Sequence, residues 1–276
     1  MDARELLKAW PAWQRAGTET VLASPAWRMP VRLNGTACEL KSSDPVADLL
    51  VLDVTLDGEP HRLALADSPA YADLHLLWSR RGELPEALLL ALAEKECGGV
   101  FSLVETATRR MLAVKGLSGN AEGLRFFSVA GAGVDVAFGL DVTPDLAAVL
   151  GRLDNIDPSH PSVRASTRPV RAVRGRLELV DEDLGELTPG SFLLLPDTFG
   201  ADARWVPVED LEAAGDLVVA APETAEMSFA AFADEAFPPL PDGTESELLR
   251  GSRRLCRCAD ARVGQARALK VTEKDL

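Results

Sequence analysis

The chain has 276 residues, 47% hydrophobic and 26% charged, which suits one large or two modest globular domains with a buried core. The formal net charge of −14 disfavours binding to nucleic acid or to an anionic membrane surface. The sequence shows no signal peptide and no apolar run of the ~20 residues that a membrane span needs. We therefore expect a cytoplasmic protein that does not insert into a membrane directly.

The first 160 residues predict a mixed α/β domain. Residues 5–15 carry leucines and tryptophans at helical spacing, and Pro11 limits that helix, which is either a lid on the core or a docking helix. Residues 49–56 and 61–66 alternate around Asp57-Gly58, which predicts an antiparallel hairpin. Residues 124–129 and 134–140 predict a second hairpin across the loop 130–133.

Helical spacing predicts the remaining elements of this domain. Apolar residues recur through residues 84–111 at the spacing of one long helical segment, which Gly98-Gly99 breaks or kinks. Residues 145–153 predict a short helix, and the Pro- and Ser-rich stretch 155–169 is typical of an interdomain linker.

After the linker, residues 161–225 predict a small all-β domain. Phenylalanines and alanines over 229–237 then form a helical stripe, which is either a capping helix for the β domain or a groove-binding helix. The last part, residues 226–276, is expected to hold this helix and a flexible basic tail. From Arg250 to Lys270 the tail has seven Arg/Lys and one acid, so it is either a solvated terminus or a docking segment for an acidic partner.

The four cysteines are too few and too scattered for a disulfide framework, so we expect reduced thiols. Cys256 and Cys258 form a C-x-C pair in the basic tail. A metal site there would need further thiols or histidines, and none is close in sequence, so we expect no metal.

The segment 171–195 combines a strand, a short Leu-containing connection, a tight turn and a second apolar strand. Gly175 marks a bulge or bend in the first strand. Thr188-Pro189-Gly190 is a tight turn, because Pro presets φ at one corner and Gly accepts a positive φ at the next. The apolar positions of the segment that we single out are Val173, Leu177, Leu179, Leu184, Leu187, Leu193 and Leu195.

This pattern resembles the SPOA (surface presentation of antigens) domain, whose signature is a strand with a Gly, a Leu-containing segment, L-x-P-G-D and an apolar strand. Ser191 replaces the common acidic residue after Pro-Gly. Residues 84–114 are similar to the helix-rich stretch that precedes the first SPOA domain in the SctQ/YscQ/HrcQ family. These proteins form the cytoplasmic ring, or sorting platform, of bacterial type III secretion systems and are related to flagellar motor switch proteins.

The resemblance implies a structural role and a set of partners. Members of this family connect an SctK-like accessory protein near the membrane ring to an SctL-like regulator of the export ATPase. Their SPOA domains pair with a second SPOA domain or with another copy. The residues expected to form that pairing core and its turn are Val173, Leu177, Leu179, Leu187, Pro189, Gly190, Leu193 and Leu195. Family members usually carry two SPOA domains. The second one here is missing, degenerate or on a separate polypeptide.

No motif predicts an enzyme or a cofactor. The sequence has no Gly-rich phosphate loop, no G-x-S-x-G and no H-E-x-x-H, and its three histidines are far apart. We therefore expect a non-catalytic scaffold without cofactors. The alternatives are a flagellar motor switch-type SPOA adaptor, or a soluble α+β binding protein unrelated to secretion.

Overall fold

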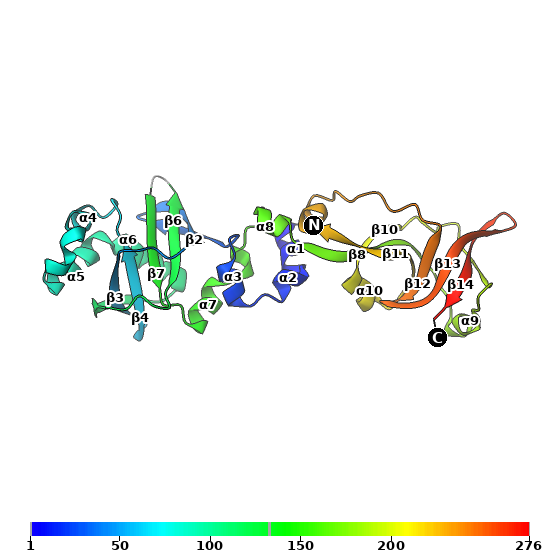
Figure 1. The fold of residues 1–276 in the computed structure, drawn as a ribbon, viewed down its shortest axis with the longest axis horizontal. Coiled ribbons are helices and arrows are strands. Elements are labelled where there is room, and N and C mark those ends of the chain that lie inside the picture. The colour runs from blue at the N-terminus through cyan, green and yellow to red at the C-terminus, as the bar shows by residue number, and fades with distance from the viewer. Residues whose placement is uncertain (1, 132–133, 276) are drawn as a thin grey trace. The chain divides into compact units, whose positions relative to one another are not determined.

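The protein is a mixed α+β chain with two antiparallel seven-stranded sheets, and the computed structural model describes residues 2–131 and 134–275 (Figure 1). The chain divides into two compact units, residues 2–163 and residues 164 onward, each built around one sheet. The helix α8 (Pro161–Arg164) lies at the boundary. In the expected linker, Ile156 pairs with Trp27 in a β-bridge, so the first part of that segment belongs to the first unit.

The sheet of the first unit has the strand order β1-β2-β6-β7-β4-β3-β5. Its strands are β1 (Arg28–Leu33), β2 (Thr36–Ser42), β3 (Leu49–Leu56), β4 (Glu59–Ala66), β5 (Leu112–Leu117), β6 (Arg125–Gly131) and β7 (Val134–Leu140). Both predicted hairpins are confirmed, as β3–β4 and β6–β7. Residues 132–133 of the second predicted loop lie outside the described residues.

Two tight turns in this sheet have the same backbone geometry. Asp57 and Gly58 both have positive φ, at 52° and 89°, which matches the twist of the hairpin strands β3 and β4. Asn34 and Gly35 have φ of 49° and 82° and join β1 to β2 in the same way. The β1–β2 hairpin was not predicted.

The helices of the first unit are α1 (Ala3–Ala9), α2 (Pro11–Gln14), α3 (Thr18–Ala23), α4 (Ala72–Leu77), the 3₁₀ turn η1 (Trp78–Glu83), α5 (Glu86–Glu96), α6 (Gly98–Thr108), α7 (Pro144–Leu150) and the 3₁₀ turn η2 (Leu153–Asn155). The predicted break at Gly98-Gly99 is confirmed, because α5 ends and α6 begins on either side of Cys97. The helical segment ends earlier than predicted. Arg109 takes a left-handed φ of 58°, and Met111 is exposed rather than on a buried stripe.

The sheet of the second unit has the order β10-β8-β11-β12-β13-β14-β9. Its strands are β8 (Thr167–Arg176), β9 (Phe192–Leu194), β10 (Arg204–Pro207), β11 (Leu217–Ser228), β12 (Glu245–Arg250), β13 (Arg253–Val263) and β14 (Ala266–Lys274). Three short helices accompany them, α9 (Asp181–Glu186), α10 (Val208–Ala214) and α11 (Phe229–Ala233). The unit is therefore not all-β, and its sheet does not end near residue 225.

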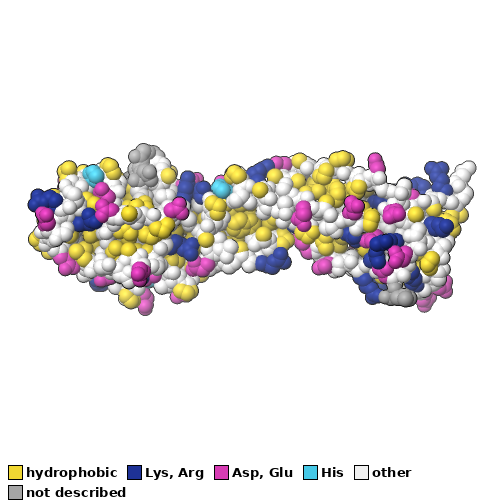
Figure 2. Space-filling model, in the orientation of Figure 1, with side chains coloured by type: hydrophobic (Ala, Val, Ile, Leu, Met, Phe, Trp, Pro, Cys, Tyr) yellow, Lys and Arg dark blue, Asp and Glu magenta, His cyan; other side chains and the backbone are white. Residues whose placement is uncertain are grey.

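The prediction of a flexible basic tail is wrong, because β12, β13 and β14 are inner strands of this sheet. Leu248, Leu269 and Val271 from these strands are fully buried. Several arginines of this segment pair with acids, such as Arg250 with Asp181 and Arg254 with Glu247 and Asp275. Figure 2 shows basic and acidic side chains gathered together beside the C-terminus.

Candidate protein-interaction surface

The predicted bulge in β8 is confirmed, and it divides the expected pairing core between the two faces of the sheet. In the pairing with β11, Gly175 lies opposite Val219 but Val173 lies opposite Ala220, so Arg174 is an extra residue. Side chains alternate between faces along a strand, and one extra residue reverses that alternation. Val173 therefore packs with a separate cluster that includes Leu211.

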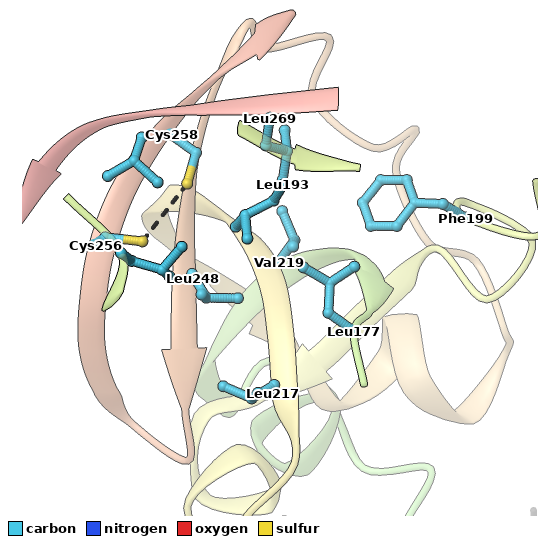
Figure 3. Packing of buried hydrophobic residues seen from close by; sticks show 11 residues of the cluster. Leu177, Leu193, Phe199, Leu217, Val219, Leu248, Cys256, Cys258 and Leu269 are labelled. Carbon is cyan, nitrogen blue, oxygen red and sulfur yellow. Dashed lines mark hydrogen bonds between the residues drawn. The ribbon is translucent and has the colours of Figure 1, made fainter. Parts of the chain in front are cut away.

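Most of the other predicted residues come together on the opposite face (Figure 3). Leu177, Leu187 and Leu193 are buried in one cluster, and Leu179 and Leu195 pack against it while partly exposed. The structure therefore brings together five of the predicted apolar residues and leaves Val173 apart.

This apolar cluster also contains residues that the sequence reasoning missed. They come from the loop before β10 and from the strands β11 to β14, and they are Phe199, Leu217, Val219, Leu248, Cys256, Cys258, Leu269 and Val271. One signal was available, because the residues Leu269 and Val271 alternate with Lys270 in the pattern of a half-buried strand.

The predicted turn between α9 and β9 has the geometry expected from Thr188-Pro189-Gly190. The Ser191 N–H donates to the Thr188 carbonyl over 2.9 Å, and Gly190 has a φ of +99°. The Ser191 hydroxyl accepts from the Thr188 N–H at 3.0 Å. The Ser191 side chain thus closes the turn by accepting a backbone N–H. The Gly190 N–H then donates to Val271, so the turn is tied to β14.

Gly175 leaves room for the ring of Phe199. A Cβ atom at position 175 would lie 2.6 Å from the Phe199 Cε2 atom, which is closer than real contacts allow. Phe199 is itself buried, and Arg267 from β14 lies over its ring at 5.8 Å from the centroid. The glycine in the strand is thus explained by close packing as well as by the bulge.

A cleft of about 1090 Å³ opens directly over this cluster. Its apolar lining includes the predicted site residues Leu177, Leu187 and Leu193, together with Phe199. Its other lining side chains are mostly acidic: Glu178, Asp183, Glu186 and Asp202, with Arg176 as a cation. The cleft therefore has an apolar floor and an acidic rim.

The short strand β9 beside this cleft is an edge strand with apolar side chains exposed. It pairs with β14 through groups such as the Leu195 N–H, which donates to the Arg267 carbonyl. Backbone groups of an edge strand alternate in direction, so the peptide groups of Phe192 and Leu194 point away from β14. The side chains of Phe192 and Leu194 are 49% and 62% exposed. Such an edge can accept another strand.

Lys274 and Arg250 fix α9 beside the same cleft. The Lys274 ammonium donates to the Gly185 carbonyl at 2.9 Å, at the end of α9 where carbonyls lack helical partners. Arg250 donates to the Asp181 carboxylate at the start of this helix. The basic segment therefore helps to shape the cleft.

Comparisons with known proteins assign no family to the chain. No protein-family model matches it, and no curated protein sequence matches it significantly. Within residues 2–131 and 134–275, the longest apolar helices are too short to cross a membrane. The described residues also contain no group of three or more His, Cys, Asp or Glu side chains arranged to hold a metal ion.

Proposed function

We propose that the chain is a non-catalytic scaffold of the cytoplasmic sorting platform of a bacterial type III secretion system. In this proposal the second unit is SPOA-like and pairs with another SPOA domain, or with its own copy, through β9 and the cleft. The observation that carries the proposal is that most of the motif residues form one cluster under an open, apolar strand edge.

The physical case rests on the backbone N–H and C=O groups of β9 that point away from β14 and can hydrogen-bond to a partner strand. A partner strand would pair with the outward peptide groups near Phe192 and Leu194 and would cover both exposed side chains. Burying apolar surface stabilises such a complex by roughly 25 cal/mol per Å² before the cost of association is subtracted.

The rim of the cleft sets the chemistry of the partner segment. Glu178, Asp183 and Glu186 disfavour an acidic partner and favour one whose apolar residues are flanked by Lys or Arg. In the assembly that we propose, the second unit binds the SPOA partner and the SctL-like ATPase regulator. The first unit contacts the SctK-like accessory protein.

The proposal is tested with the full chain and the SPOA, SctL-like and SctK-like proteins of the same bacterium. Light scattering after size-exclusion chromatography should detect a complex of defined stoichiometry. Deleting the gene should abolish type III secretion, and the wild-type chain should restore it.

A matched pair of variants locates the site. Leu194→Asp places a charge on the exposed edge and should prevent both complex formation and the rescue of secretion. Leu76→Asp changes a residue of the first unit that is even more exposed, at 75%, and should still bind the SPOA partner. Rescue of secretion by Leu194→Asp, or a wild-type chain that ignores every partner, would contradict the proposal.

A further inference from the structure

Cys256 and Cys258 lie two residues apart on β13, and their sulfur atoms face each other (Figure 3). The two Sγ atoms are 3.7 Å apart, and each residue is only 1% exposed. Cys258 also borders a cavity of about 420 Å³ that is lined by Ser246, Arg257 and Thr272. A small molecule in this cavity therefore lies beside Cys258, whose sulfur is in contact with that of Cys256.

The backbone geometry permits a bond between these sulfurs. Two residues of extended strand span about 6.4–6.8 Å, at the upper end of the Cα separations that disulfides bridge. The pairing of β13 is irregular with both of its neighbours. Its register with β12 shifts between Leu248 and Leu249, and its register with β14 shifts between Arg257 and Cys258. Such irregularities bend a strand, and bending on the side of the two thiols shortens their separation.

We propose that Cys256 and Cys258 are a reversible redox site, which a small hydroperoxide converts into an intrastrand disulfide. The Cys256 thiolate attacks one peroxide oxygen and the O–O bond breaks, which gives a sulfenic acid and, with the proton that the thiol lost, one water. The Cys258 sulfur then attacks the sulfenic sulfur, and the S–O bond breaks to release a second water. Two thiols and one hydrogen peroxide thus give one disulfide and two waters, with two electrons passing from sulfur to oxygen.

The order of these steps follows from the hydrogen bond between the thiols. Either thiol can donate to the other across this contact. When the Cys258 S–H donates to the Cys256 sulfur, the hydrogen bond lowers the pKa of Cys256 and raises the pKa of Cys258. The thiolate is the reactive form of cysteine, so Cys256 is the attacking sulfur. Burial raises the pKa of Cys97 to about 12, so this thiol is a matched unreactive control in the same chain.

The surroundings favour a disulfide over a metal complex. The pair is packed among Leu248, Leu269 and Val271, where a transient thiolate is consumed by the reaction but the permanent net charge of a metal complex is costly. A monovalent metal ion bound by two thiolates would form a complex with a net negative charge. A divalent ion such as Zn²⁺ needs more ligands than the two sulfurs supply. A disulfide is neutral, needs no further ligand and fits an apolar core.

The test uses the reduced full chain, treated with hydrogen peroxide, then denatured and alkylated. Trypsin cleaves after Arg254, Arg257 and Arg262, so it separates the two cysteines into the peptides 255–257 and 258–262. We expect these two peptides to be recovered joined, and to be separated again by a thiol reductant. Loss of free Cys256 and Cys258 should be at least about tenfold faster than loss of Cys97 and Cys38, since reactivity follows thiolate character.

Two results would overturn the proposal. One is recovery of both cysteines as separate alkylated peptides at peroxide doses that oxidise Cys97. The other is a joined peptide that forms only after the protein is unfolded in denaturant, because the fold would then play no part. Cys258→Ala should remove the joined peptide and leave Cys256 as a sulfenic acid that a dimedone-type reagent labels, whereas Cys97→Ala should leave the joined peptide unchanged.

Discussion

The two sheets differ in how their edge strands are protected from pairing with other chains. In the first unit, two backbone N–H groups of β5 have side-chain acceptors, since Leu112 donates to Glu105 at 2.9 Å and Leu117 donates to Glu86 at 3.1 Å. The opposite edge strand, β1, contains Pro30, which has no N–H to offer. In the second unit, β9 combines outward peptide groups with the exposed apolar side chains of Phe192 and Leu194.

This difference indicates which sheet is suited to associate. Proteins protect exposed strand edges with charges, prolines or covering elements, because an open edge pairs with other chains. The first sheet has such protection on both edges. An open apolar edge next to a cleft is therefore a feature of the second unit, and the predictions below test that contrast.

The largest effect is expected from removing the apolar support of β9. Leu269 is fully buried in β14 and lies opposite Leu193 of β9. Leu269→Ala should lower the free energy of unfolding by about 2–5 kcal/mol through lost burial and a cavity. Leu194→Ala, at an exposed position of the edge itself, should change it by less than about 0.5 kcal/mol. Chemical denaturation measures both, and equal effects would mean that β14 is not a core strand.

A smaller effect is expected at the floor of the cleft. Gly175→Ala forces the new methyl group against Phe199 and should cost about 1–3 kcal/mol of stability. Gly185→Ala in α9 is the control, because nothing lies within 4 Å of an added Cβ there. Thermal unfolding of the two variants measures the difference. A Gly175→Ala protein as stable as the wild type would contradict the close packing of Phe199.

Removing a carboxylate that protects the β5 edge should make the first sheet behave more like the second. Glu105→Ala leaves the Leu112 N–H without its acceptor and should cost about 1–2 kcal/mol. It should also raise the tendency of the chain to self-associate at high concentration, which sedimentation measures. Glu94→Ala, an exposed acid on α5, is the control and should do neither. Identical sedimentation of the two variants would mean that the Glu105 carboxylate does not keep β5 from pairing with other chains.

The smallest effect is expected at the ion pair between Arg250 and Asp181. Both side chains are largely exposed, at 41% and 81%, so water and salt screen their attraction. Arg250→Ala should lower the stability by no more than about 1 kcal/mol, and by less at high salt. A loss as large as that of Leu269→Ala would show that the charges of this segment matter more than its apolar residues.

The parts of the fold that were predicted correctly have strong local signals. The hairpin β3–β4 combines alternating apolar residues over 50–56 with Asp57-Gly58, and the turn before β9 combines Pro189 with Gly190. The β1–β2 hairpin carries an equally strong signal in Asn34-Gly35 that the sequence reasoning overlooked.

The errors in the second unit have physical causes that sequence spacing hides. The arginines of β12 and β13 were interpreted as a solvated tail because several of their partners are far away in sequence, such as Asp181 for Arg250. The split of Val173 from Leu177 depends on one extra residue at the bulge, which composition does not locate. The cleft itself depends on Phe199, which meets Gly175 only in the folded chain.

The most direct test of the central claim is amide hydrogen exchange of the full chain, alone and with an SPOA-bearing partner. The account predicts that the outward amides of Phe192 and Leu194 exchange quickly in the free chain and become protected in the complex, or at high concentration if the chain pairs with itself. The edge strands β1 and β5 should not change. Protection of β1 or β5 with no change at Phe192 and Leu194 would contradict the account.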